Sequence, residues 1–242
     1  MHSIFSVVDP FLTLGSFAIA AVGAYPINVK KIQPTMLVCS AHKWLRGPAG
    51  TCLSYIAPDV HEQWMPLDSH GRNRDGGSLE SSELPPTYSN DGRKFDSGGK
   101  TNPILLPMLK ASMEKIVKLH PKTTQQTLKA LMEPLLAWIK SEEGSKFFTV
   151  SPGPRASHLI GLVPVSDKTP AQMIQMAETL RANHGVVLAV RSGRFRISPY
   201  FGNTTEDIES LIDGLKDVMS GKPVVEELTS PQSVASSELF DL

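Results

Sequence analysis

The chain has 242 residues and a mass of 26.3 kDa, and its 24 lysines and arginines balance its 24 aspartates and glutamates. Zero net charge argues against a nucleic-acid binder held by a basic field and against a long disordered charged arm. The two cysteines, Cys39 and Cys52, are too few for a disulfide framework or a four-ligand zinc site. We therefore expect a reducing, cytoplasmic location.

An apolar stretch at residues 11–27 fails the tests for a signal peptide and for a membrane anchor. The ten residues before it contain no lysine or arginine, and they include Asp9. A spanning helix needs about 20 unbroken apolar residues, whereas Gly23 and Pro26 are among the residues that interrupt this stretch. We expect no membrane segment.

Short apolar runs at residues 36–40 and 51–56 predict two neighbouring buried strands. Residues 57–100 are rich in Asp, Gly, Ser, Asn and Pro, which predicts a long loop region, and long loops in compact domains tend to be functional. Leucines at helical spacing then predict two helices, at residues 103–119 and 123–140.

The last third has the pattern of a small α+β unit. Its expected strands are residues 158–165, 186–192 and 194–199, and its expected helices are residues 169–183 and 204–219. Thr204 or Thr205 is the expected N-cap of the second helix. The predicted domains are residues 1–142, an incomplete α/β domain ending in a helical hairpin; 143–221, the small α+β domain; and 222–242, a disordered tail.

The strongest chemical signal is S-A-H-K-W-L-R-G-P-A-G at residues 40–50, between the two predicted strands. A deeply placed lysine at position 43 would have a lowered pKa, and its amine could then attack an aldehyde. The alternative for Lys43 taken alone is a lysine that snorkels from a surface loop.

The residues around Lys43 resemble the cofactor-lysine segment of the class V aminotransferase family, pyridoxal-phosphate enzymes of fold type I. In that family S-x-H-K is followed by a G-P-x-G turn and a strand, as here. Residues 21–29, 92–112 and 190–215 resemble, in the right order, the segment after the pyridine-binding strand, the R-x-F loop with its helix, and the terminal N-T-x-E-D-I motif. The resemblance runs from about residue 4 to residue 215. It implies the C-terminal part of a fold type I α/β transferase: a partial large-domain sheet plus a small α+β domain.

The resemblance also implies roles for particular residues. Lys43 would form a Schiff base with pyridoxal 5'-phosphate and move the proton at the substrate α-carbon, with His42 in support. Arg196 would hold the substrate α-carboxylate through a bidentate contact, unless it is an ordinary surface arginine. Thr101 or Asn102, at a helix start, would bind the cofactor phosphate across a dimer interface. The implied partners are an amino acid or other small amine and a second copy of the chain, with no nucleic acid, membrane or metal.

The aspartate that pairs with the pyridine nitrogen departs from the family pattern. In the family it lies twenty-six residues before the lysine, and that position is Phe17 here. Asp9, at the end of the strand-like FSVVD, lies eight residues too early. We predict that residues 10–17 are an insertion and that Asp9 is the family aspartate.

The family's phosphate-binding loop and the residue that stacks on the cofactor ring match nothing in this sequence. Two hypotheses follow. The chain is the C-terminal part of a pyridoxal-phosphate enzyme of amino-acid metabolism, inactive by itself, or it is a non-catalytic remnant that dimerises with or regulates a full-length paralogue.

A cysteine desulfurase of this family carries a nucleophilic cysteine between its two arginine-bearing strands. Only residues 192–195 separate Arg191 from Arg196 here, and none of them is a cysteine. Cys39 and Cys52 are expected to be small core residues. We therefore expect a reaction of the aminotransferase, epimerase or carbon–sulfur lyase branch, with the choice among them open.

Overall fold

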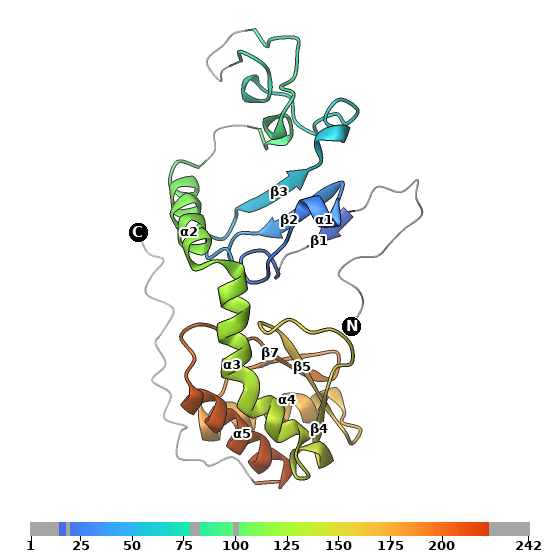
Figure 1. Cartoon of the computed structure of the whole chain (residues 1–242), viewed down its shortest axis with the longest axis vertical. Coiled ribbons are helices and arrows are strands. Elements are labelled where there is room, and N and C mark those ends of the chain that lie inside the picture. Colours follow the sequence, from blue (N-terminus) through green and yellow to red (C-terminus); the bar gives the residue numbers. More distant parts are fainter. Residues whose placement is uncertain (1–14, 18–19, 78–82, 99–101, 223–242) are drawn as a thin grey trace, which may run out of the picture. The chain divides into compact units, whose positions relative to one another are not determined.

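The structure is a computed structural model that describes residues 20–77, 83–98 and 102–222, together with the backbone of residues 15–17 (Figure 1). The chain divides into two compact units, Met1–Gln125 and Gln126–Leu242, which are described separately here. The predicted boundary between residues 142 and 143 stays a prediction.

The first unit contains a three-stranded sheet in the order β1-β2-β3, in which β1 runs parallel and β3 antiparallel to β2. Its strands are β1 (Gly15–Phe17), β2 (Met36–Ser40) and β3 (Cys52–Ile56). Alternate residues of β2, Leu37 and Cys39, are buried, as expected for a strand with one face on a core. The expectation that β3 is buried was wrong, because among the described residues β3 pairs with β2 alone and Cys52, Leu53 and Ser54 are exposed.

The long loop region is confirmed for residues 57–77 and 83–98, and in these described residues the helical elements are short turns of 3-10 helix, Pro58–Val60, Gly71–Asn73 and Gly92–Phe95. Hydrogen bonds from side chains take the place of a regular backbone pattern in this region. The buried amide of Asn73 donates to the carbonyls of Asp68 and Lys94, and the buried Lys94 amine donates to the carbonyl of His61. The loop therefore has a polar core of its own.

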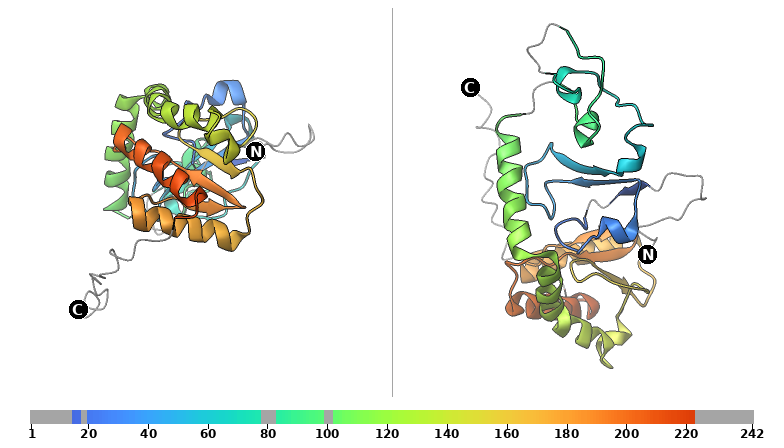
Figure 2. Two further views of the ribbon diagram at one scale, coloured as in Figure 1. Left: turned by 90° about the horizontal axis from the view of Figure 1, so that it is seen from below. Right: turned by 45° about the horizontal axis from the view of Figure 1, so that its top comes forward.

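The helices of the first unit begin with the short α1 (Val29–Ile32), followed by α2 (Leu105–Leu119) and then α3 (Pro121–Lys140), which continues into the second unit. The last two confirm the helices predicted at residues 103–119 and 123–140, and their arrangement as a hairpin stays a prediction. Helix α2 buries Leu109 and Ile116, seven residues apart on one face. Figure 2 shows α2 running beside the β1–β3 sheet.

The second unit packs helices on a four-stranded antiparallel sheet of order β4-β5-β7-β6 (Figure 1). Its elements are β4 (Phe148–Val150), β5 (Ile160–Pro164), α4 (Pro170–His184), β6 (Ala189–Arg191), β7 (Arg194–Ile197) and α5 (Thr205–Met219). Phe148, Leu162 and Phe195 of the sheet are almost fully buried against Leu180 of α4 and Leu215 of α5. This core holds β7 in the centre of the sheet.

Helices α4 and α5 both begin with a capping box. Asp207 N donates to Thr204 Oγ1 at 3.4 Å, and Thr204 N donates to Asp207 Oδ2 at 3.0 Å. Thr169 and Gln172 make the same exchange at the start of α4. The structure therefore selects Thr204 over Thr205 as the cap of α5.

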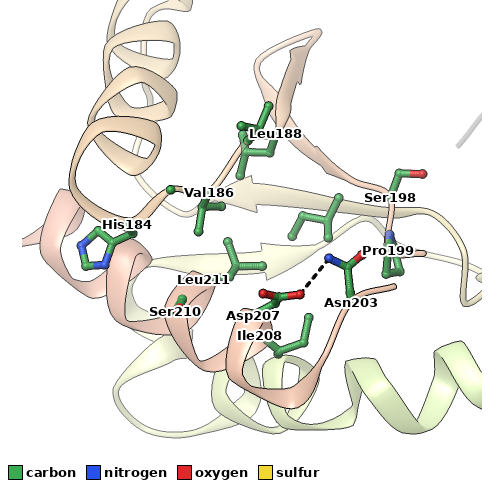
Figure 3. Close-up of a pocket in the computed structure, with 13 residues that line it drawn as sticks. His184, Val186, Leu188, Ser198, Pro199, Asn203, Asp207, Ile208, Ser210 and Leu211 are labelled. Atoms are coloured by element: carbon green, nitrogen blue, oxygen red, sulfur yellow. Dashed lines mark hydrogen bonds between the residues drawn. The ribbon is translucent and has the colours of Figure 1, made fainter. Parts of the chain in front are cut away.

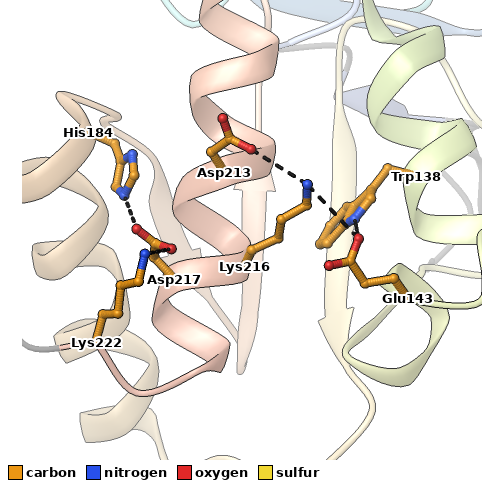
Figure 4. A network of polar contacts seen from close by, with 7 residues as sticks. All are labelled: Trp138, Glu143, His184, Asp213, Lys216, Asp217 and Lys222. Atoms are coloured by element: carbon orange, nitrogen blue, oxygen red, sulfur yellow. Dashed lines mark hydrogen bonds and ion pairs between the residues drawn. The ribbon is translucent and has the colours of Figure 1, made fainter.

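A network of polar contacts lies at the C-terminal end of α5 (Figure 4). Asp217 contacts Lys222 Nζ at 2.7 Å and His184 Nε2 at 3.2 Å. The hydrogen bond from Lys222 is the main reason that the pKa of Asp217 lies below its ordinary value. On the neighbouring face Lys216 lies 3.9 Å from Glu143, which accepts a hydrogen bond from the Trp138 indole. These contacts connect α5 to α4 and to the end of α3.

Across the described part of the chain, no helix combines the length and the apolar character that crossing a bilayer requires.

Candidate functional site

The turn after β2 presents two neighbouring side chains, His42 and Lys43, at the surface. Its other residues are anchors: Ala41, Trp44 and Leu45 are buried. Two backbone hydrogen bonds close the turn, one to the Ala41 carbonyl at 2.8 Å and one to the Lys43 carbonyl at 3.0 Å. Lys43 is exposed, so the deep placement considered from the sequence is not observed among the described residues. Its position is nevertheless well defined, because buried neighbours hold the backbone on both sides.

Residues 21–25 pack against this turn. Gly23 has a φ of 92°, and a Cβ on it would lie 2.6 Å from the Trp44 carbonyl oxygen. The same segment is closed by a hydrogen bond from Ala24 N to Ala21 O, and the Ala24 carbonyl accepts from Gln125 Nε2 at 2.9 Å. Only glycine permits both this φ and this approach.

Helix α2 holds the turn from another direction. Ser112 Oγ donates to the Arg46 carbonyl at 2.8 Å. A Cβ on Gly47 would lie 2.7 Å from Leu109 Cδ1, so the G-P-x-G segment lies directly against the helix at this point. Two motifs of the sequence, residues 40–50 and 92–112, are therefore in contact in the folded chain.

Ser40 is a residue that the sequence reasoning missed. Its Oγ is buried and has no hydrogen-bond partner within the described residues. A buried hydroxyl without a partner is costly, so such an atom at a strand end fits an oxygen of a bound group. The signal was available, because Ser40 is the first residue of S-x-H-K.

The predicted phosphate-binding residues are only partly described. Asn102 accepts hydrogen bonds at Oδ1 from Ile104 N at 2.9 Å and from Leu105 N at 3.2 Å, so its carbonyl oxygen caps the start of α2. Thr101 lies outside the described residues, as does Asp9. Phe17, twenty-six positions before Lys43, ends β1 and pairs with Val38.

Arg196 lies in the second unit, near the end of the central strand β7. Its neighbours Phe195 and Ile197 are buried, whereas Arg196 is exposed on the opposite face. Across the sheet it pairs with Gly161 of β5 and Ala189 of β6. Both of these cross-strand partners are small residues.

The two cysteines lie on the strands before and after this turn, and they differ in burial. Cys39 is buried and donates to the Leu53 carbonyl at 3.5 Å, and burial raises the pKa of its thiol. A raised pKa keeps the thiol protonated and a poor nucleophile. Cys52 is exposed, so its expected place in the core was wrong. The turn between β6 and β7 consists of Ser192 and Gly193, both with positive φ.

A pocket of about 210 Å³ lies in the second unit between the end of α4, β7 and the start of α5 (Figure 3). Asn203 and Asp207, which line it, are joined by a hydrogen bond of 3.1 Å. Backbone hydrogen bonding to Thr204 is the main cause that lowers the pKa of Asp207, so this carboxylate serves the helix cap. None of the predicted site residues lines this pocket.

The sequence match decides the family, because residues 18–211 match the family described as Aminotransferase class-V. The chain belongs to the class V aminotransferase family. Pyridoxal 5'-phosphate is the cofactor of this family. The match begins directly after residues 10–17, whose assignment as an insertion stays a prediction. No curated protein matches the chain significantly.

Solved structures show the same fold. The chain resembles the cysteine desulfurase CsdA from Escherichia coli with a TM-score of 0.66 and 16% identity, over 84% of this chain and 51% of that one. A cysteine desulfurase from Thermococcus onnurineus NA1 gives 0.66 and 20% identity, over 86% and 52%. The cystine C-S lyase C-DES gives 0.61 and 17%, over 81% and 50%. The fold is therefore part of pyridoxal-phosphate fold type I, and the chain spans about half the length of these structures.

The residues around Lys43 fit this cofactor. An exposed amine can react with its aldehyde, and the partnerless Ser40 hydroxyl, three residues away, can bond one of its oxygens.

Proposed function

We propose that this chain is part of a pyridoxal-phosphate-dependent enzyme of amino-acid metabolism, with Lys43 as the point of cofactor attachment. The observation that carries the proposal is the anchored turn after β2, which holds an exposed lysine beside His42 and close in sequence to the partnerless Ser40 hydroxyl. When bound, the cofactor supplies an electron sink for negative charge at the substrate α-carbon.

Lys43 has two tasks in this proposal. Its amine attaches the cofactor, and once released it moves the proton at the substrate α-carbon as a general base and acid. His42 supports the cofactor beside it, and Ser40 donates to a cofactor oxygen. Asp9 pairs with the pyridine nitrogen, which makes the ring a stronger sink.

A homodimer completes the site in this proposal, with Thr101 or Asn102 reaching the cofactor phosphate of the partner subunit. Arg196 binds the α-carboxylate of an amino acid or other small amine substrate. Its guanidinium can make two parallel hydrogen bonds, which a lysine could not reproduce. We place the enzyme in the cytoplasm, since its two cysteines are unpaired thiols.

We infer a reaction without a persulfide intermediate. The two-residue turn Ser192–Gly193 contains no cysteine, and the thiol of Cys39 is buried. Transamination, epimerisation and carbon–sulfur lysis are the remaining reactions.

A cofactor titration tests the role of Lys43. Pyridoxal phosphate is added to the purified chain, and the absorbance band of lysine-bound cofactor is recorded. The band should form with the unmodified chain and with Lys31→Ala, which removes another exposed lysine, and should be lost with Lys43→Ala. An equal band in the Lys43→Ala variant would contradict the assignment.

A second candidate is a non-catalytic partner of a full-length paralogue. It is favoured by the finding that the chain spans about half the length of the solved structures it resembles. This candidate predicts a folded chain, shown by circular dichroism, that gives no cofactor band but co-purifies with a co-expressed full-length family member. A cofactor band that depends on Lys43 in the chain alone would exclude it.

A further inference from the structure

One face of the β4–β7 sheet carries three arginines, Arg191, Arg194 and Arg196. Residues directly opposite in an antiparallel pair share a face, and residues two apart on a strand do too. Arg191 lies opposite Arg194, and Arg196 follows two positions later. The other face of β7 carries the buried Phe195 and Ile197.

These arginines lack counter-charges. Within the described residues none of the three takes part in an ion pair, and strands β4 to β7 contain no aspartate or glutamate. Like charges directly opposite each other on a sheet are unfavourable. An anionic ligand would relieve this repulsion.

Arg194 is directed toward Ser151, which lies in the same row of the sheet as Arg196. Ser151, Gly161, Arg196 and Ala189 form one row across the four strands, because Ser151 N donates to Gly161 O at 2.9 Å and Arg196 pairs with Gly161 and Ala189. Arg194 Nη1 donates to Ser151 Oγ at 3.4 Å. The Arg194 side chain therefore crosses β5 and brings its guanidinium group into the row of Arg196.

Gly161 makes this arrangement possible. A Cβ at this position would lie 2.5 Å from Ser151 Oγ, the atom that positions Arg194. With glycine there, residue 161 itself places no side chain between Ser151 and Arg196.

We propose that Arg194 binds a second acidic group on the ligand whose α-carboxylate is held by Arg196. This inference rests on the proposed role of Arg196, and it assigns the substrate class: an amino acid with a carboxylate side chain, or the corresponding dicarboxylic oxo acid. Each guanidinium offers the planar fork that matches one carboxylate. Ser151 is a positioning residue, and Arg191, which ends β6 beside the turn, lies outside the row.

Titration of the full chain with succinate and with butyrate, followed by NMR, tests the proposal. Both probes have four carbons, but only succinate carries two carboxylates. We expect succinate to bind at least tenfold more tightly than butyrate. Arg194→Gln should remove about this tenfold advantage and leave butyrate binding unchanged, whereas Arg196→Gln should weaken both probes.

Arg191→Gln is the matched control, because it removes the same charge from the same hairpin. It should change succinate affinity less than twofold, and Ser151→Ala should cause a partial loss of the succinate advantage. Equal binding of the two probes, or equal losses for Arg191→Gln and Arg194→Gln, would show a general positive field and overturn the proposal. Circular dichroism establishes that each variant is folded, and a second variant, Arg194→Lys, which keeps the charge but not the fork, should also lose most of the advantage.

No cofactor is present in this titration, so its result is independent of Lys43. A succinate preference without a cofactor band would uphold the two-arginine site and reject the catalytic role of the chain. A cofactor band without the succinate preference would uphold the role of Lys43 and reject the two-arginine site.

Discussion

At the scale of single residues, Gly23 controls the shape of the turn that carries Lys43. Its φ of 92° and the 2.6 Å approach of a built Cβ to the Trp44 carbonyl oxygen leave room only for hydrogen. Backbone strain of this kind costs on the order of 1–3 kcal/mol. A side chain at position 23 would also affect function, because a displaced Trp44 would move the neighbouring Lys43.

We expect Gly23→Ala to lower the free energy of unfolding by about 2 kcal/mol, from that strain together with the close contact. Urea denaturation followed by tryptophan fluorescence measures the change. Gly92→Ala is the control, since a Cβ there meets nothing within 4 Å. Equal stability of the two variants would show that the turn adapts to a side chain.

Asp217 gives the second unit a pH dependence at acid pH. The hydrogen bond from Lys222, with smaller contributions from His184, lowers the pKa of this carboxyl in the folded chain. Its stabilisation is therefore present above the ordinary aspartate pKa of about 3.9 and is lost as the pH falls through the lower folded value.

The Asp217→Asn variant should have a lower Tm than the unmodified chain at pH 7, and the two values should approach each other as the pH falls below about 4. Thermal unfolding at a series of pH values measures this. Asp213→Asn, which removes a carboxylate that is 3.6 Å from Lys216 and more exposed, should change the Tm less. A constant difference at all pH values would contradict the assignment.

At the scale of elements, the hydrogen bonds at the start of α5 show which of two adjacent threonines is the N-cap of the helix. Thr204 Oγ1 accepts from Asp207 N, and Thr205 is the first residue of the helix. Thr204→Ala should therefore lower the free energy of unfolding by about 1 kcal/mol, whereas Thr205→Ala should have little effect. Chemical denaturation of both variants compares them, and the opposite order would move the cap by one residue.

The helices were predictable because their signal is local. Spacing of apolar residues at three and four positions placed the ends of α2 through α5 to within two residues. Strands β1 and β4 have three residues each, and they exist through pairing with β2 and β5, which no local pattern reveals. The prediction that β3 is buried was wrong for the same reason, because the burial of a strand depends on which elements lie beside it.

At the scale of the whole molecule, the order of motifs along the chain predicted the family and fold type I, and the family match over residues 18–211 and the solved structures confirm both. The position of Lys43 and His42 on a turn after a strand also followed from the motif. The Ser40 hydroxyl without a partner among the described residues, and the hydrogen bond from Arg194 to Ser151, did not follow from it, since both depend on contacts between segments far apart in sequence. The roles of Asp9 and Thr101 stay predictions.

The most direct test of the central claim is the location of covalently bound cofactor. The chain is incubated with pyridoxal phosphate, reduced with borohydride, digested and analysed by mass spectrometry. We predict that the label is concentrated on Lys43 and is missing from this peptide in the Lys43→Ala variant. A label spread evenly over the exposed lysines, or a folded chain without label, would contradict it.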